Sequence, residues 1–235
     1  MAPTPAPHSE PEAVVVRLSI QGVDLIADRA GALYWPAERA LLVADLHLEK
    51  GSSLARSGQL LPPYDTVATL ARLSAAVARH VPRRIYFLGD AFHDPFAGER
   101  IGAEALAAIT TLGAGRELVW ISGNHDPAPP DAVPGARVSE IRRGGLVLRH
   151  LPSSRDAAGE IAGHLHPVAR VQTRAAVVRR ACFISDGTRA MLPAFGAYAG
   201  GINVREGAIA GLFTRPQVHV LGERRVLPVA YERLV

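Results

Sequence analysis

A chain of 235 residues, 48% hydrophobic and 20% charged, has the length and composition of a globular protein with a core of its own. None of its apolar runs reaches the roughly 18 to 20 residues that a membrane-spanning helix needs, so no membrane segment is expected. The formal net charge of +4 is carried almost entirely by arginine, which suits phosphate-rich partners, although base composition in the coding DNA explains the same bias.

The two ends of the chain differ in character. Residues 1–12 are rich in proline and alanine and lack the basic start and apolar core of a signal peptide, so we expect a disordered tail. Residues 13–235 contain no long linker and no internal repeat, and a single domain is expected there. The one cysteine, Cys182, excludes an internal disulfide and favours a reducing, cytoplasmic compartment.

The first half of the domain alternates strands with helices. Short hairpin strands are expected at residues 14–20, 23–28 and 32–35. Three continuous apolar runs, typical of strands buried on both faces, follow at residues 41–44, 85–88 and 118–121. The spacing predicts helices at residues 65–79, with Asp65 as the cap, and at 99–112. This order is typical of right-handed parallel crossovers.

The second half consists mainly of short strands. They are expected at residues 146–149, 182–185, 189–192, 208–213 and 218–221. With little helix between them, they predict a second, mixed or antiparallel sheet packed on the first. Open α/β sheets bind ligands at the carboxyl ends of their strands, so polar residues that follow strands should meet at one edge.

Five polar motifs each follow a strand-like run. They contain Asp45 and His47, then Asp90, then Asn124 and His125, then His150, and finally His164 and His166. The two-residue spacing in the first and last motifs would place both side chains on one side of an extended backbone. Imidazole, carboxylate and amide ligands suit manganese, iron, cobalt or zinc ions, and the absence of thiolates argues against a structural zinc site.

Each motif, taken alone, can be explained as ordinary structure without a function. Asp-x-His and Gly-Asp pairs are common in turns, Gly-Asn-His-Asp is rich in turn formers, and a single histidine such as His150 carries no signal. The pair His164 and His166 is stronger, because two histidines after a glycine have little structural purpose. All five motifs in this order are hard to obtain by chance, so together they predict one metal site.

With these residues the sequence resembles the calcineurin-like metallophosphoesterases, whose pattern is Asp-x-His, Gly-Asp, Gly-Asn-His-Asp/Glu, His and Gly-His-x-His. The resemblance runs from about residue 41 to residue 167. Residues 45–50, 162–167 and 192–201 are also similar to a bacterial subgroup, PdeM, which is encoded beside a DNA ligase and a helicase and called a DNA damage response endonuclease. The fold that the resemblance implies is an α/β sandwich of two mixed β-sheets flanked by helices.

The resemblance also implies two metal sites and a proton donor. One divalent ion would take Asp45, His47, Asp90 and His166, and the other would take Asp90, Asn124, His150 and His164, with Asp90 bridging them. Two such ions, manganese first and iron, cobalt or zinc as alternatives, would hold a bridging hydroxide that attacks phosphorus. His125, which is not a ligand in the family, would protonate the leaving group.

Four residues near the motifs have two open interpretations each. His93 stands where the family's protein phosphatases have a different residue; the Gly-Asp-x-Phe-His form is similar to that of double-strand-break repair nucleases. His93 either orients His125 or makes a plain structural hydrogen bond. Lys50 either contacts a substrate phosphate or is a solvated helix-start residue. Phe195 and Tyr198 could stack on a base, but packing in a glycine-rich turn is favoured.

The sequence therefore supports three hypotheses. The first is a dinuclear metal-dependent phosphodiesterase, a DNA nuclease in DNA repair, with DNA as partner and with the ligase and helicase as partners by resemblance only. The second keeps the chemistry but assigns it to a small-molecule phosphoesterase acting on a nucleotide, a cyclic nucleotide or a lipid pyrophosphate. The third, a non-enzymatic scaffold, is disfavoured because a scaffold has no use for the proton donor His125.

Overall fold

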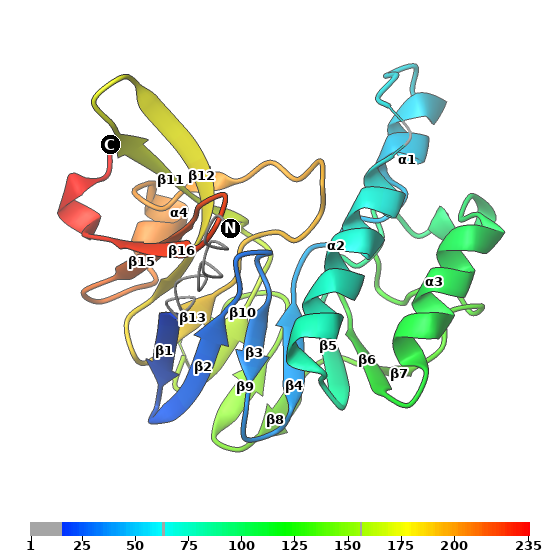
Figure 1. The fold of residues 1–235 in the computed structure, drawn as a ribbon, viewed down its shortest axis with the longest axis horizontal. Helices are drawn as coiled ribbons and strands as arrows, with labels where there is room; N and C mark the ends of the chain where they lie inside the picture. Colours follow the sequence, from blue (N-terminus) through cyan, green and yellow to red (C-terminus); the bar gives the residue numbers. More distant parts are fainter. Residues whose placement is uncertain (1–15, 63, 156) are drawn as a thin grey trace, which may run out of the picture.

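The computed structural model describes residues 16–62, 64–155 and 157–235. The predicted tail, residues 1–12, lies outside this described part. Figure 1 shows two β-sheets packed on each other, with helices α2 (Asp65–His80) and α3 (Ala103–Gly113) on the outer side of the first sheet. In the described part of the chain, no helix is long and apolar enough to cross a membrane.

The first sheet has seven strands arranged in the order of the sequence. They are β1 (Val16–Ile20), β2 (Val23–Ala27), β3 (Leu33–Trp35), β4 (Ala40–Val43), β5 (Arg84–Leu88), β6 (Glu117–Ile121) and β7 (Ala136–Val138). Strands β1 to β4 pair antiparallel, as the predicted hairpins require. From β4 to β7 the pairing is parallel, so the carboxyl ends of β4, β5 and β6 lie at one edge.

Three helices lie in the first half of the chain, namely α1 (Lys50–Arg56), α2 (Asp65–His80) and α3 (Ala103–Gly113). The predicted second helix begins later than residue 99, because a 3₁₀ turn (Ala97–Glu99) comes first and the backbone is extended at Gly102. Asp65 does not cap α2; its carboxylate accepts a hydrogen bond from the Gly51 N–H instead. Asp65 therefore joins α2 to the first turn of α1.

The second sheet is mixed and has nine strands. They are β8 (Ile141–Arg143), β9 (Leu146–Leu148), β10 (Glu160–Ala162), β11 (Pro167–Gln172), β12 (Val177–Ser185), β13 (Ala190–Met191), β14 (Ile202–Asn203), β15 (Gln217–Leu221) and β16 (Val226–Val229). Strands β9 and β10 are parallel, so their carboxyl ends also share an edge. Strands β11 and β12 form a long antiparallel hairpin.

One predicted strand is wrong. Residues 208–213 do not form a strand; helix α4 (Gly207–Ala210) occupies the start of this run, and Ile209 is buried. A short apolar run cannot be assigned to strand or buried helix from periodicity alone, and here the tertiary packing decides for the helix. A 3₁₀ turn, Tyr231–Arg233, lies near the end of the chain.

Three apolar clusters hold the layers together. The first lies between the sheets and joins side chains such as Leu42 and Leu88 to Leu148 and Phe183. A second packs the other face of the first sheet against α2 and α3 through residues such as Leu73. The third covers the outer face of the second sheet and includes Cys182, which is fully buried. The predicted fold class, an α/β sandwich of two mixed sheets flanked by helices, is confirmed.

Candidate metal centre

The predicted ligands meet at the edge where parallel strands of both sheets end. Asp45 follows β4, Asp90 follows β5 and Asn124 follows β6, all in the first sheet. His150 follows β9 and His164 follows β10, both in the second sheet. The sandwich therefore brings ligand groups from two sheets, far apart in sequence, to one place.

The ligand loops have an unusual backbone. Five of the seven predicted ligands have positive φ values: Asp45 (54°), His47 (45°), Asp90 (45°), His164 (72°) and His166 (47°). The expected extended backbone between paired ligands is therefore wrong, because left-handed residues make tight loops in both motifs. Such conformations cost of order 1 kcal/mol or more each and persist only where the surroundings hold them, typically at functional sites.

Three motif glycines leave room for ligands from other motifs. A Cβ atom on Gly89 would overlap the ring of His150, and one on Gly123 would overlap Asp90. At Gly163 it would lie 2.6 Å from Asp45 Oδ2. Any larger residue would push a ligand away, so these glycines belong to the site although they bind nothing.

Asp45, His47 and His166 form the first group, with one possible ligand atom from each within 4.8 Å of the others. The Nε2 atoms of His47 and His166 are 3.2 Å apart, and Asp45 Oδ1 is 3.4 Å from His166 Nε2. Asp45 is fully buried, and its Oδ1 has no hydrogen-bond partner among the described residues. Its other oxygen accepts the His164 N–H at 2.9 Å, which links the two ligand loops.

Asp90, His150 and His164 form the second group in the same way. His150 Nε2 is 3.3 Å from Asp90 Oδ2, 3.2 Å from His164 Nδ1 and 2.8 Å from Asn124 Oδ1. His150 Nδ1 lies 3.0 Å from the Leu88 carbonyl and donates to it, which leaves Nε2 as the ligand atom.

The electrostatics favour neutral imidazoles at His47 and His164 beside negative carboxylates, and act in the opposite direction at His150. Burial, and then the charge of His166, lowers the pKa of His47 to about 3. Burial and the charge of His150 also lower the pKa of His164. Burial acts against ionisation of Asp90, but its hydrogen bonds and the nearby histidines bring its pKa down to about 2. Burial likewise acts against a charge on His150, yet the hydrogen bond to Asp90 and the charges of Asp45 and Asp90 raise its pKa.

These residues fit a pair of divalent cations. One Asp45 oxygen is buried without a hydrogen-bond partner among the described residues. The ring nitrogens of His47 and His166 face each other, and an Asn124 oxygen approaches the ring nitrogen of His150. A positive charge placed between these atoms would satisfy all of them. The raised pKa of His150 shows the same demand for positive charge between Asp45 and Asp90. Carboxylate, imidazole and amide donors without thiolate suit the ions expected from the sequence.

Asp90 belongs to the second group, while its backbone carbonyl supports the first. That carbonyl accepts the His47 N–H at 2.9 Å, and Asp90 Oδ1 accepts the His125 N–H at 2.9 Å. Asp90 thus touches the backbone of two other motifs as well as the ring of His150. Its expected bridging of both ions remains a prediction.

His125 lies at the exposed side of the centre. Its Nδ1 donates to the carbonyl of His93 at 3.0 Å, and the two rings stack with centroids 5.3 Å apart. The ring of His47 lies edge-on to His125, with centroids 5.3 Å apart. The group that orients His125 by hydrogen bonding is therefore the backbone of His93, while the His93 imidazole contributes stacking.

Lys50 starts α1 beside this cluster. Its positive charge contributes to lowering the pKa values of His47 and His93, after the larger effect of burial. In the described part of the chain, no carboxylate lies within ion-pair distance of Lys50. An amine in this place is available to an anionic ligand.

Asp126 was given no role from the sequence, although it ends the third motif. It is buried, its Oδ2 accepts the Phe92 N–H at 2.9 Å, and its carbonyl accepts the Gly123 N–H at 3.2 Å. Burial raises the pKa of Asp126 to about 7. The side chain joins the loops that carry Asp90 and Asn124, and its place in the motif was the available signal.

The segment of residues 193–201 is hydrogen-bonded to the backbone of the first ligand loop. Phe195 N donates to the Ala44 carbonyl at 2.8 Å, and Gly196 N donates to the Asp45 carbonyl at 3.0 Å. Phe195 is fully buried, so packing, the favoured interpretation, is its role. Tyr198 donates its hydroxyl to the Pro62 carbonyl at 2.7 Å, which ties the segment to the α1–α2 connection.

Comparison with known proteins agrees with this geometry. No protein-family model and no curated protein sequence matches the chain. The crystal structure of Pseudomonas putida nuclease MPE is 30% identical, covers 92% of this chain and 100% of its own, and superposes with a TM-score of 0.72. The Escherichia coli phosphoesterase YfcE is 13% identical over 81% of this chain and 98% of its own, with a TM-score of 0.38. The identity to nuclease MPE over nearly the whole chain, with the five motifs at one sheet edge, places this protein in the calcineurin-like metallophosphoesterase family.

Proposed function

We propose that this protein is a metal-dependent phosphodiesterase that cleaves DNA and acts in DNA repair. The observation that carries the proposal is the pair of ligand groups at one sheet edge, with the non-ligand His125 beside them. The similarity to a nuclease over 92% of the chain supports nucleic acid as the substrate.

The ligand assignment from the family pattern is the one that we propose. One cation would be held by Asp45, His47, His166 and Asp90, and the other by Asp90, Asn124, His150 and His164. When bound, two such cations supply charge at the phosphoryl oxygens and activate water for attack on phosphorus. Manganese is our first choice of metal.

The chain's own residues would place the substrate and the proton. With Nδ1 of His125 held by the His93 carbonyl, Nε2 is the atom that can carry a proton to the leaving oxygen. The His93 backbone therefore acts as a positioning group for His125. Lys50, close to His47 and without a carboxylate partner in the described part of the chain, is proposed to contact a substrate phosphate.

A basic hairpin supports DNA as the substrate. Residues 161–185 contain no Asp or Glu but include Arg170, Arg174, Arg179 and Arg180 on the β11–β12 hairpin, which starts directly after His166. Arg170 and Arg179 are directly paired across the hairpin, where like charges are destabilising. Arg179 also donates to the Gly201 carbonyl at 2.6 Å, next to the His166 loop. Such a surface suits a phosphate backbone.

One observation favours the small-molecule alternative. A cavity of about 380 Å³ opens beside the second ligand group and is lined in part by Ser122, Asn124, Arg149 and His150. That volume lies within the range of small-molecule sites, so a nucleotide, cyclic nucleotide or lipid pyrophosphate could occupy it.

Cleavage assays with manganese, iron, cobalt and zinc separate these functions. We expect manganese-dependent cutting of single- or double-stranded DNA by the native protein and none by Asp90→Ala. Hydrolysis of small esters only, with no DNA cut under any of the metals, would contradict the proposal. Rates on a chromogenic phosphodiester and a chromogenic phosphomonoester then distinguish diesterase from monoesterase action.

The wider role in repair is also a proposal. The DNA ligase and helicase of the same repair system are proposed partners, and a cytoplasmic location goes with a substrate of chromosomal DNA. Co-purification of the tagged protein with either enzyme from cells exposed to a DNA-damaging agent would test the partnership. A preparation that contains neither enzyme would contradict it.

A further inference from the structure

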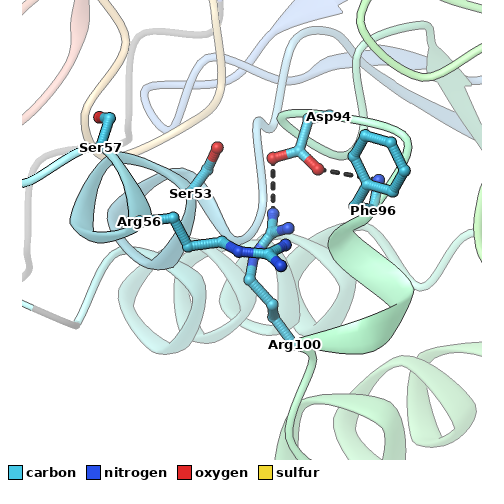
Figure 2. A pocket seen from close by; sticks show the side chains of 6 residues that line it. All are labelled: Ser53, Arg56, Ser57, Asp94, Phe96 and Arg100. Carbon is cyan, nitrogen blue, oxygen red and sulfur yellow. Dashed lines mark hydrogen bonds and ion pairs between the residues drawn. The ribbon is translucent and has the colours of Figure 1, made fainter.

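The edge of the sheets that carries the two ligand groups is called the metal edge below. A cavity beside it has no part in the proposed chemistry. Helix α1 and residues 94–100 border an open cavity of about 330 Å³, at the lower end of the range for ligand sites. Figure 2 shows the side chains around it, which are Ser53, Arg56, Ser57, Asp94, Phe96 and Arg100. None of the predicted metal ligands lines this cavity.

The wall of the cavity is rigid, and one aromatic ring on it is exposed. Arg100 donates to Asp94 at 2.6 Å and to the Ser52 hydroxyl at 3.0 Å. The other Asp94 oxygen accepts the Phe96 N–H at 2.8 Å, as the dashed lines in Figure 2 show. These bonds hold the backbone of Phe96 in place, yet 59% of the residue's surface remains exposed. An exposed ring on a backbone held in this way offers a flat face to a ligand.

The charge of the cavity is positive. Asp94 is neutralised by Arg100, whose guanidinium is largely buried. Arg56 has only Glu99 as an ion-pair partner in the described part of the chain, at 3.5 Å, and more than half of each side chain is exposed. An exposed pair of this kind contributes little, so Arg56 is available to an anionic ligand.

The cavity adjoins the metal edge along one face of α1. Lys50 and Ser53 are spaced i and i+3, so they lie on the same side of α1, and Ser57 follows directly after the end of this helix. Lys50 lies near His47, while Ser53 and Ser57 line the cavity. On the opposite wall, Asp94 directly follows His93, whose ring lies 5.5 Å from that of His47. A DNA strand bound at the metal edge would therefore pass this cavity.

We propose that the cavity is a nucleotide subsite, in which an unpaired base of the substrate strand stacks on Phe96 and a neighbouring phosphate pairs with Arg56. The chemistry on the page fits this occupant, since the walls offer an aromatic face, a guanidinium and two serine hydroxyls. The base must be unpaired because a base within a duplex has both faces covered by its neighbours. This inference rests on the proposed nuclease function.

The test compares two substrates in manganese-loaded protein. We would measure kcat and KM for a fluorophore-labelled single-stranded oligonucleotide and for bis(p-nitrophenyl) phosphate, a small diester that has no flanking nucleotide. Stacking of one base is worth about 1–3 kcal/mol, so Phe96→Ala should lower the ratio of kcat/KM values, oligonucleotide over ester, about tenfold, mainly through KM. Phe96→Tyr keeps the ring and should restore the ratio to within about twofold.

Tyr64→Ala is the matched control, because Tyr64 is a similarly exposed aromatic residue outside the cavity. It should leave the ratio unchanged. Arg56→Gln should weaken oligonucleotide binding and reduce its salt dependence by about one phosphate contact. An unchanged ratio for Phe96→Ala, or an equal loss in Tyr64→Ala, would overturn the subsite while leaving the nuclease proposal intact. Native protein that hydrolyses the ester but cuts neither single- nor double-stranded DNA would instead overturn the nuclease proposal itself.

Discussion

The metal edge and the surfaces beside it are built in opposite ways. At the metal edge, Asp45, Asp90 and His150 are almost completely buried, and the loops around them are tied by backbone hydrogen bonds and left-handed residues. Beside it, Phe96 and the arginines of the β11–β12 hairpin are exposed and make few bonds.

This difference assigns the chemistry to the buried metal edge and the choice of substrate to the exposed side chains beside it. The fold over-determines the position of the ligands, whereas the flanking side chains can change without disturbing the core. Figure 1 shows α1 and the β11–β12 hairpin on opposite sides of the region where β4, β9 and β10 end. Substitutions in the two regions should therefore alter different measured quantities.

The largest effect should come from the metal edge. His164→Ala removes one ligand of the second group, so metal content should fall from about two ions per chain towards one and phosphodiester hydrolysis should fall on the order of 10³-fold. Metal analysis of protein purified in manganese provides the measurement. His219→Ala, which removes a buried histidine on β15 outside the site, is the control. Unchanged metal content in His164→Ala would contradict the ligand assignment.

The next effect separates proton donation from metal binding. His125→Ala should slow cleavage of DNA and other alkyl esters about 100-fold, because their leaving group needs a proton. Esters with acidic leaving groups need none, and their hydrolysis should fall far less. Equal losses on both kinds of ester would remove His125 as the acid, and a loss of metal would make it part of the metal edge.

A smaller effect should come from the basic hairpin. The double variant Arg170→Gln/Arg179→Gln should weaken DNA binding about tenfold and lower the salt dependence of binding by about two phosphate contacts. Hydrolysis of a small chromogenic diester by each variant shows whether the catalytic edge is intact. Arg224→Gln/Arg225→Gln, an equal charge change on an exposed turn, is the control. Identical salt dependence in both double variants would show that DNA binding depends on the net charge of the protein and not on the position of the hairpin arginines.

The smallest effect on activity should come from a buried ion pair outside both regions. Burial opposes the ionisation of Asp28, but hydrogen bonds from His80 and Arg79 outweigh it and hold the pKa of Asp28 well below its usual range. A lowered folded-state pKa stabilises the fold above the unfolded pKa of about 4, and this stability is lost as the pH falls below that value. Asp28→Asn should therefore cost about 2 kcal/mol of unfolding free energy at pH 7.

That cost should shrink as the pH is lowered below about 4, while activity at pH 7 changes little. Urea unfolding of both proteins at several pH values provides the measurement. A difference that stays constant with pH would exclude ionisation of Asp28 as its cause. A large loss of activity would show that the metal edge depends on distant packing, and would weaken the contrast between the two regions.

Much of the architecture could be predicted from local patterns. The apolar runs before Asp45, Asp90 and Asn124 form β4, β5 and β6 within a residue of their expected bounds, because a strand buried on both faces has an unmistakable composition. Parallel pairing then places the residues that follow those strands at one edge. The predicted ligands of the first sheet meet there for that reason, and the packing of the two sheets brings His150, His164 and His166 to the same edge.

Other features could not be predicted, because they depend on contacts between distant segments. Asp65 was expected to cap its own helix, but it accepts a hydrogen bond from Gly51 of α1, a helix whose bounds were not predicted. The run at 208–213 forms helix α4 and not a strand, since a short apolar run fits either. The role of Asp126 became visible only when Phe92, from the loop that carries Asp90, was brought beside it.

By itself, the sequence determined the identity and order of the ligand residues, because their chemistry and their places after apolar strands are local properties. Only the tertiary structure decided how they meet. The left-handed turns at Asp45 and His164, the space left by Gly89 and Gly163, and the exposed ring of Phe96 all arise from packing between loops of different strands. Such packing depends on contacts across the whole domain, which no short stretch of sequence encodes.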